Sequence, residues 1–474
     1  MKENVERELK LSVEPGFELP PLPVEVTPKR LRAIYYDTSD LRLARHGVTL
    51  RRRSEEGIDR WQLKLPNGDA RLELEWEADE SAVPGETTWL LTAHLRGREL
   101  EPVAELQTLR RAVRLAAHGE PAAEVVHDSV DVLEDNRVVR SFDEVEIEQI
   151  RQGSERLIAR VEKQLRAAGA RTSDGRPKVF RALDLPAPAA PRVPRKAPAV
   201  EHLRAYLQRQ FAALVASDPA ARRGDEEGVH RMRVASRRMR SVLKEAERLL
   251  DSSWVQETRD ELKWLGGVLG EVRDPDVFSA YVESEVRSLG DAAAEGGTEL
   301  VALIRSQSKA SRGRLMEALD SPRYLSLLDR LDATAESMPV ASAHESLRTL
   351  LRRAARRTRH KLRRVSPKSA ADTELHELRI AAKRARYAGE LAETAAGSAA
   401  RRLAKHAAAV QTILGEHQDA VVAEERLEGL AGAATPAGAF VAGRLAERQR
   451  DRRARARAKL ARAADRLQRA TRKL

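Results

Sequence analysis

Charged side chains of both signs recur at two-residue spacing in several segments of the first 184 residues. Residues two apart on a strand share a face, so each segment predicts a strand with one charged face. Carboxylate oxygens are hard ligands for Mg²⁺ or Mn²⁺, and Arg and Lys neutralise phosphoryl oxygens. A sheet that curls with these faces inward would suit a metal-chelated phosphate chain, whereas a half-buried sheet would only expose them to solvent. The segments are Glu6, Glu8 and Lys10; Arg51 and Arg53; Arg71, Glu73 and Glu75; and Glu144, Glu146 and Glu148.

Two predicted helices, far apart in the sequence, carry cations at spacings of three and four residues. At about 100° per residue, such positions form one stripe, and the opposite side of each helix is apolar. Such a stripe can follow a linear polyanion, although a single charged stripe is more often only a solvated face. We call them the first basic stripe, His230, Arg233, Arg237, Arg240 and Lys244, and the second basic stripe, His376, Arg379, Lys383 and Arg386.

The helix that follows each stripe is predicted to end alike, with residues 269–274 reading LGEVRD and residues 414–419 reading LGEHQD. This repetition indicates an internal duplication. A duplicated stripe that keeps its His and its cations in phase is unusual for a surface that needs only solubility. The duplication therefore favours polyanion binding over a solvated face.

The chain of 474 residues exceeds the roughly 250–300 residues at which a single core stops growing. Residues 185–199 read LPAPAAPRVPRKAPA, a Pro/Ala stretch that predicts a semi-rigid linker. Alternating segments precede it, and segments with helical spacing, rich in Ala, Leu, Arg and Glu, follow it. We therefore expect an α+β multidomain protein with an antiparallel β domain over 1–184 and an all-α domain over 200–474. The expected strands are 5–13, 49–53, 61–65, 71–77, 124–132 and 140–150, and the expected helices of the β domain are 87–95 and 153–168.

The net charge of +12 is distributed unevenly between the two domains. Residues 1–184 hold 30 basic and 35 acidic side chains, a net charge of −5, which leaves +17 for the remainder of the chain. A basic domain attracts nucleic acid, an acidic membrane surface or polyphosphate. An aromatic content of 4% disfavours single-stranded nucleic acid, which binds by stacking on aromatic side chains.

Composition also predicts the compartment. The absence of Cys excludes disulfide scaffolds, thiolate metal sites and Cys nucleophiles, and it favours a reducing cytoplasm. The first ten residues are charged, and no run of about 18 apolar residues occurs, so neither a signal peptide nor a membrane span is expected.

Residues 1–184 resemble the CYTH domains, the triphosphate tunnel metalloenzymes. Residues 6–10, ERELK, are similar to the Glu-x-Glu-x-Lys signature of that family, and residues 35–53 and 61–66 also resemble it. The resemblance implies an eight-stranded antiparallel β tunnel that hydrolyses a triphosphate with Mg²⁺ or Mn²⁺. It implies metal ligands at Glu6, Glu8, Asp128, Glu146 and Glu148; catalytic roles for Glu6, Glu8, Lys10, Glu73 and Glu75; and substrate contacts from Lys10, Arg51, Arg53, Lys64, Arg71, Arg110, Arg111 and Lys178.

Residues 200–474 resemble the CHAD family of α-helical domains, on the evidence of the two basic stripes and the two Gly-Glu-x-x-Asp segments. This resemblance implies two similar four-helix bundles around a basic cavity that binds inorganic polyphosphate. The predicted function is thus metal-dependent hydrolysis of inorganic triphosphate, with polyphosphate bound by the helical domain. The alternative is a non-catalytic polyphosphate-binding protein of polyphosphate granules; an organic triphosphate also stays open as the substrate. No membrane, nucleic-acid or obligate protein partner is expected.

Overall fold

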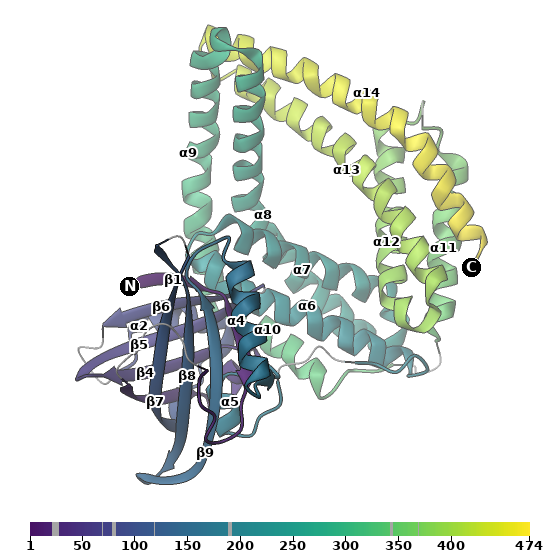
Figure 1. Cartoon of the computed structure of the whole chain (residues 1–474). Helices are drawn as coiled ribbons and strands as arrows, with labels where there is room; N and C mark the ends of the chain where they lie inside the picture. Colours follow the sequence, from purple (N-terminus) through teal and green to yellow (C-terminus); the bar gives the residue numbers. More distant parts are fainter. Residues whose placement is uncertain are drawn as a thin grey trace. The chain divides into compact units, whose positions relative to one another are not determined.

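Figure 1 shows the computed structural model of the chain, which describes residues 1–20, 28–68, 70–77, 82–117, 119–187, 192–341, 345–367 and 369–474. The side chains of residues 307–309 are also outside the description. The chain divides into two compact units, Met1–Ala189 and Ala190–Leu474. Both unit boundaries lie within the predicted linker, of which residues 188–191 are outside the described part. None of the helices that the structure describes is both long enough and apolar enough to cross a bilayer.

In the described part of the first unit, ten strands form one antiparallel sheet in the order β1-β6-β5-β4-β3-β7-β8-β9-β2-β10. The expected number was eight. The difference arises because the first strand is divided at Arg7, so that its first half pairs with β6 and its second half with β9, and because the two-residue β10 is added. The strands are β1 (Lys2–Glu6), β2 (Glu8–Ser12), β3 (Lys29–Asp37), β4 (Thr49–Glu55), β5 (Ile58–Asn67), β6 (Ala70–Glu77), β7 (Glu101–Ala117), β8 (Glu120–Glu134), β9 (Arg137–Gln149) and β10 (Arg171–Thr172).

The apolar faces of the strands pack against short helices. On β4 to β6, Leu50, Trp61 and Leu74 pack around Leu90 and Leu95 of α2 (Gly85–Leu90) and α3 (Thr92–Leu95). On β7 to β9, Val113, Val125 and Ile147 likewise belong to a buried cluster with Val161 and Leu165 of α4 (Glu155–Ala167). Because successive strand residues alternate between faces, this packing turns the charged positions to the opposite side of the sheet.

The charged side of the sheet is partly filled by α5 (Lys178–Ala182). Phe180 of this helix belongs to a buried cluster with Tyr35, Leu106 and Val130. Tyr35 also bonds to Arg51, so the apolar cluster and the charged side chains share one interior. The same helix brings Lys178 into that interior, where its side chain is 9% exposed.

In the second unit, the described residues form nine helices, and two sets of four correspond to each other (Figure 1). Within each set, consecutive helices pack against one another, as a pair of duplicated up-and-down bundles requires. The first set is α6 (Ala199–Arg222), α7 (Glu226–Glu245), α8 (Ser252–Leu289) and α9 (Ala294–Leu319); α10 (Pro322–Asp332) follows it; the second set is α11 (Leu347–Arg364), α12 (Asp372–Ala396), α13 (Ser398–Ala431) and α14 (Pro436–Arg472).

The sequence places each basic stripe on the second helix of its set, α7 or α12, and each Gly-Glu-x-x-Asp segment on the third, α8 or α13. The prediction that the third helices end at these segments is wrong. Both helices continue for more than a turn past Asp274 and Asp419, and α8 does so through Pro275. Packing of the flanking Val272 and Phe278 in the core outweighs the poor helix propensity of Gly270 and Pro275.

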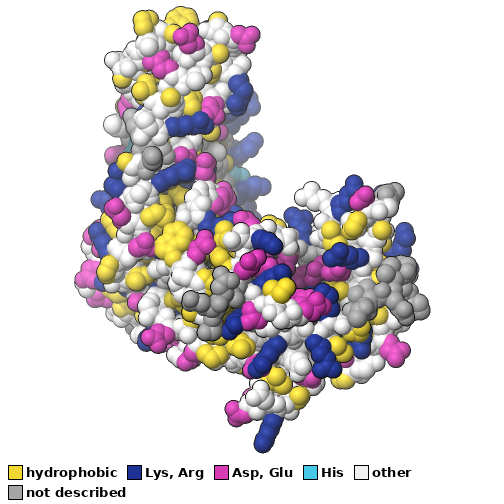
Figure 2. Space-filling view, turned by 90° about the vertical axis from the view of Figure 1, so that its left-hand side faces the viewer, with side chains coloured by type: hydrophobic (Ala, Val, Ile, Leu, Met, Phe, Trp, Pro, Cys, Tyr) yellow, Lys and Arg dark blue, Asp and Glu magenta, His cyan; other side chains and the backbone are white. Residues whose placement is uncertain are grey.

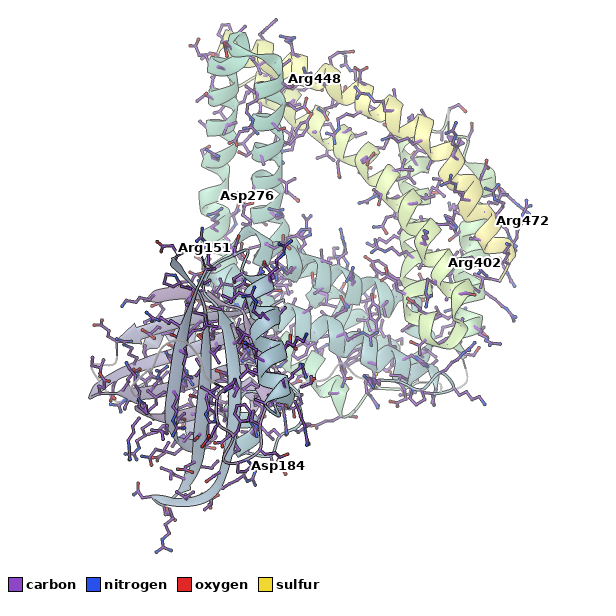
Figure 3. The ribbon with its side chains drawn as sticks, viewed as in Figure 1. Arg151, Asp184, Asp276, Arg402, Arg448 and Arg472 are labelled. Atoms are coloured by element: carbon purple, nitrogen blue, oxygen red, sulfur yellow. The ribbon has the colours of Figure 1, made fainter. Side chains whose placement is uncertain are left out.

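Contacts between helices of different sets join the second unit into one body. The α14 residue Arg448, labelled in Figure 3, donates to Glu285 on α8 at 2.8 Å. On the surface, Lys and Arg side chains are interspersed with Asp and Glu, as Figure 2 shows for one face. Most such surface pairs contribute little stability, about 0–1 kcal/mol each. Buried apolar positions along the helices therefore provide most of the stabilisation.

Candidate functional site

Three carboxylates meet where β2 pairs with β9. In this register Glu8 is opposite Glu148, and Lys10 is opposite Glu146. One carboxylate oxygen from each of Glu8, Glu146 and Glu148 lies within 4.8 Å of the other two. Burial, followed by the charge of Glu146, raises the pKa of Glu148 to about 7. The Glu146 carboxylate is compensated by nearby cations, whereas the raised pKa of Glu148 favours a hard divalent cation at this place. We call Glu8, Glu146 and Glu148 the carboxylate trio.

Glu6 belongs to a different group from Glu8. Its carboxylate accepts a hydrogen bond from Lys64 Nζ at 2.5 Å, and the same Nζ lies 3.6 Å from Glu73. The cause is the division of the first strand, which pairs Glu6 with Arg71 on β6 and Glu8 with β9. Of the two predicted metal ligands on this strand, the structure therefore brings only Glu8 into the trio.

Asp128 was predicted to be a metal ligand, but its carboxylate is already held by two cations. Arg110 donates to it through two nitrogens, at 2.9 and 2.7 Å, and Lys178 Nζ lies 3.0 Å away. Burial would raise the pKa of Asp128, yet Lys178 and Arg110 outweigh it and lower that pKa. Asp128 also forms a second group with Glu144 and Glu146 that could hold a metal ion, so its role as a metal ligand stays a prediction.

Three arginines on β4 and β7 form a cation-rich wall. Arg51 donates to Tyr35 Oη at 3.0 Å and to Gln62 at 2.8 Å, so two neutral groups fix its guanidinium. Burial, then the charges of Arg51 and Arg110, lowers the pKa of Arg53. These arginines therefore repel one another and would be stabilised by an anion.

The remaining predicted tunnel residues lie in three places. Lys10 donates to Glu146 at 2.6 Å, between the trio and Glu144. Glu75 accepts a hydrogen bond from Gln62 at 2.8 Å and, with Arg53, lines a cavity of 290 Å³. Arg71 is on the same face of β6 as Glu75, two positions from Glu73.

Arg111 does not join these residues, in contrast to the prediction. Adjacent residues of a strand face opposite sides, and Arg110 faces Asp128 inside. Arg111 is consequently exposed on the outer face, in register with His127.

Sequence reasoning did not assign Glu144, Tyr35 or Gln62 to the site. Glu144 contacts Lys178 and lies 3.9 Å from Lys10. Its two-residue spacing from Glu146 had placed it on a charged strand face, but no role at the site was predicted for it. Tyr35 and Gln62 gave no comparable signal, because their role depends on the register of β3, β4 and β5.

The two basic stripes of the helical unit face each other at their centres. Burial, then the charges of Arg240 and Arg237, lowers the pKa of Lys383 to about 8, and Arg379 adds to the effect. The charge effect of α7 arginines on an α12 lysine requires that the two stripes approach closely. These four residues form the central basic cluster: Arg237, Arg240, Arg379 and Lys383.

The ends of the stripes are paired with other groups. Lys244 contacts Glu247 at 2.7 Å, and Arg386 donates to Glu390 at 2.7 Å. His376 Nδ1 lies 3.3 Å from Gln418 on α13. Burial, the main cause, lowers the pKa of His230, so this histidine is neutral near pH 7.

Comparison with known proteins agrees with the two units. The family description "CYTH domain" matches residues 4–174, and the description "CHAD domain" matches residues 205–428. An uncharacterized protein of Mycobacterium tuberculosis (strain CDC 1551 / Oshkosh) is 32% identical over 498 residues, covering 98% of this chain and 95% of that protein. The chain is a CYTH–CHAD protein.

Two solved structures are among those similar to this CYTH–CHAD protein. PptA from Streptomyces chartreusis is 22% identical and covers 56% of this chain and 99% of its own, with a TM-score of 0.48. The CHAD domain from the plant Ricinus communis is 27% identical and covers 60% of this chain and 96% of its own, with a TM-score of 0.45. CYTH domains as a family act on triphosphates and related substrates and depend on a metal, and the carboxylate trio fits such an ion.

Proposed function

We propose that the CYTH unit is a divalent-metal-dependent inorganic triphosphatase and that the CHAD unit binds polyphosphate. The observation that carries the first part is one interior with two walls of opposite character. The carboxylate trio is on β2 and β9, and Arg51, Arg53 and Arg110 are on β4 and β7. The raised pKa of Glu148 and the lowered pKa of Arg53 mean that each wall has one residue whose charge is incompletely compensated, although Arg53 is paired with Glu55. A triphosphate with its metal supplies both counter-charges.

In this mechanism the protein binds and orients, and no covalent nucleophile is needed. Glu8, Glu146 and Glu148 hold Mg²⁺ or Mn²⁺, which when bound neutralises phosphate oxygens and acts as a Lewis acid. Arg51, already fixed by Tyr35 and Gln62, presents its remaining donors to the phosphoryl oxygens.

The attacking water needs a proton acceptor. Although burial would raise the pKa of Glu73, Lys64, a hydrogen bond with Glu6 and the charge of Arg51 together outweigh that effect and keep the pKa below its usual value. Glu73 is therefore ionised at neutral pH and can take the proton, with Lys64 and Glu6 holding it in place. Asp128 keeps Arg110 and Lys178 oriented toward the substrate.

The choice of an inorganic substrate comes from the second unit. In the central basic cluster, burial and the neighbouring arginines keep the pKa of Lys383 below its usual value. A polyanion would compensate these positive charges, so the cluster suits a polyanion. The stripes contain no aromatic side chain on which a base could stack. Linear polyphosphate fits this combination, and we expect the protein in the cytoplasm, associated with polyphosphate granules.

Phosphate release tests the proposal. The full chain should release phosphate from inorganic triphosphate with Mg²⁺ or Mn²⁺, and less from ATP or long-chain polyphosphate. Glu8→Gln should abolish release, whereas Glu134→Gln, an exposed site near the β8–β9 turn, should leave it unchanged. Faster phosphate release from ATP than from inorganic triphosphate would identify ATP as the preferred substrate. Equal activity of Glu8→Gln and Glu134→Gln would overturn the metal site.

The second candidate is a non-catalytic polyphosphate-binding protein. The depressed pKa of Lys383 favours it, since that feature calls for a polyanion whether or not the tunnel hydrolyses anything. The two candidates separate in one measurement. If the wild type retains polyphosphate but releases no phosphate from any triphosphate with either metal, the binding-only function is correct.

A further inference from the structure

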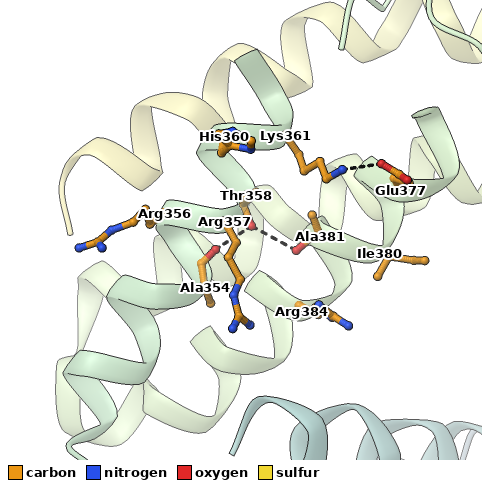
Figure 4. A pocket seen from close by; sticks show the side chains of 10 residues that line it. All are labelled: Ala354, Arg356, Arg357, Thr358, His360, Lys361, Glu377, Ile380, Ala381 and Arg384. Carbon is orange, nitrogen blue, oxygen red and sulfur yellow. Dashed lines mark hydrogen bonds and ion pairs between the residues drawn. The ribbon is translucent and has the colours of Figure 1, made fainter. Parts of the chain in front are cut away.

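A pocket of 460 Å³ lies between α11 and α12, beside the second basic stripe (Figure 4). This volume falls in the range of about 300–1,000 Å³ that is typical of small-molecule sites. Its residue Arg384 follows Lys383 directly in sequence, so the two side chains leave the helix about 100° apart. The pocket is thus a neighbour of the stripe and not a part of it.

The floor of the pocket is apolar. Ala354, Ala381 and Ile380 contribute aliphatic carbon, and Ile380 is 38% exposed. The one hydroxyl in the lining, on Thr358, is engaged with the backbone oxygens of Ala354 at 2.9 Å and Ala381 at 3.2 Å (Figure 4). The floor therefore favours the apolar body of a ligand.

Two arginines of the lining converge on a carboxylate from a third helix. Glu245, the last residue of α7, is 1% exposed, and its oxygens lie 3.6 Å from Arg357 and 3.5 Å from Arg384. Neither oxygen of Glu245 accepts a hydrogen bond within the described part of the chain. The attraction to Glu245 consequently holds the two guanidiniums in place. The side chains of Arg357 and Arg384 are 48% and 39% exposed, so their N–H groups can still donate to a ligand.

The charge of the pocket identifies the ligand class. The lining contributes four cations, Arg356, Arg357, Lys361 and Arg384, and one carboxylate, Glu377; with the buried Glu245 behind it, the sum of these charges is +2. A phosphate monoester is close to a dianion above pH 7, and paired guanidiniums bind its oxygens well. We propose that this pocket binds a phosphate monoester carried on an apolar group, of the size of a nucleoside 5′-monophosphate.

Calorimetric titration of the full chain at pH 7.5 tests this site, with adenosine 5′-monophosphate as the probe. Adenosine and inorganic phosphate should each bind at least about tenfold more weakly, because each lacks one half of the recognition. Ile380→Asp, in the apolar floor, should weaken nucleotide binding by about tenfold. Arg364→Gln, exposed on the same helix as Arg357 but outside the lining, should bind like the wild type.

Loss of Arg384 alone could act through folding, because it leaves Glu245 with one partner fewer. The double variant Arg384→Gln/Glu245→Gln keeps the charge balance and should still lose nucleotide binding at an unchanged melting temperature. Replacing Arg237 and Arg379 of the central basic cluster by Ala should leave nucleotide binding intact. No binding to the wild type, equal binding of inorganic phosphate, or equal loss in the Arg237/Arg379 variant would each overturn the proposal.

Discussion

Arg233 on α7 donates a hydrogen bond to Asp274 on α8, with 2.5 Å between Nη1 and Oδ1. In the second copy, the charges of Arg379 and Arg452 act on Asp419, as do those of Asp274 and Arg233. Each Gly-Glu-x-x-Asp segment thus places its Asp near the first cation of a basic stripe, Arg233 or Arg379. The duplicated carboxylates are internal counter-ions, which a bound polyanion must displace.

Asp274→Asn should therefore strengthen polyphosphate retention, because Arg233 keeps its position and loses its competitor. We expect about a three- to tenfold gain in affinity at low salt, with a steeper salt dependence. The pair is 35% and 56% exposed, so the change in stability should stay within about 1 kcal/mol. Calorimetry with long-chain polyphosphate at two salt concentrations measures the effect.

The matched control is Glu257→Gln, which removes the carboxylate of a similar exposed pair with Arg330, also involving α8. It changes the net charge by the same amount at a site away from the stripes. An equal gain in both variants would mean that net charge alone, and not release of Arg233, governs retention.

Replacement of Arg233, Arg237, Arg379 and Lys383 by Ala should abolish retention on long-chain polyphosphate. The expected cause is loss of the central cations, which reduces the number of released counter-ions. A control with the same charge change replaces four cations that are each paired with Glu: Arg305, Arg314, Arg323 and Arg330. Undiminished retention in the first variant would remove the binding role of both stripes.

Lys383 should make polyphosphate binding depend on pH. Its pKa of about 8 lies below the ordinary 10.5, so the folded protein disfavours the charged form. A polyanion restores that form, so binding near pH 8.5 should take up protons and weaken as the pH rises further. Calorimetry in two buffers with different ionisation enthalpies counts the protons. If Lys383→Gln takes up as many protons on binding as the wild type, a group other than Lys383 is the proton acceptor.

The same pKa predicts a stability effect of Lys383→Gln in the absence of polyanion. Because the pKa of Lys383 is lower in the folded state, its charged ammonium lowers the free energy of unfolding. This destabilisation is at its full size below pH 8 and disappears as the pH rises toward 10.5. The variant should be more stable than the wild type by on the order of 1–3 kcal/mol at pH 7, and by less at pH 9.5. Lys473→Gln, at the exposed C-terminal end, is the control for urea unfolding at both pH values.

Much of this fold follows from periodicity, and its failures have a physical cause. Five of the six expected strands are present as single strands whose boundaries shift by a few residues, and the first is divided into β1 and β2. The 17-residue strand β7 was not expected, because its LRRAVRLAA segment consists of good helix formers. Its pairing with β3 and β8 overrides that propensity. The first strand was expected to be continuous, and only the pairing partners on either side of Arg7 reveal the division.

The sequence predicted which residue types form the site, but it predicted less well which of these residues lie next to one another. Alternation alone places Glu8, Glu146 and Glu148 on charged faces, but the register of β2 against β9 brings them together. Alternation cannot choose between Arg110 and Arg111 without the register of β7 against β8, which places Arg110 opposite Asp128. The duplicated stripes were visible in sequence, whereas their approach, reported by Lys383, depends on how α7 packs against α12.

Glu8→Gln and Glu146→Gln should separate metal binding from structural neutralisation. Glu146 is 5% exposed and lies 2.6 Å from Lys10, 3.1 Å from Lys178 and 3.9 Å from Arg110. Its loss leaves three cations under-neutralised in a buried site, so we expect destabilisation of about 3–5 kcal/mol with a chelator present. Glu8 is 15% exposed and lies 3.4 Å from Lys10, so its replacement by Gln should lower the free energy of unfolding by about 1 kcal/mol or less.

Both of these variants should lose phosphate release from inorganic triphosphate, since each removes one oxygen ligand of the trio. Urea unfolding in chelator gives the stability of each variant, and phosphate release with Mg²⁺ gives its activity, with Glu134→Gln as the reference for both. Equal stability of the two variants would show that Lys10, Lys178 and Arg110 do not depend on Glu146 for neutralisation. An active Glu146→Gln would remove Glu146 from the metal site while leaving its contacts to the three cations in place.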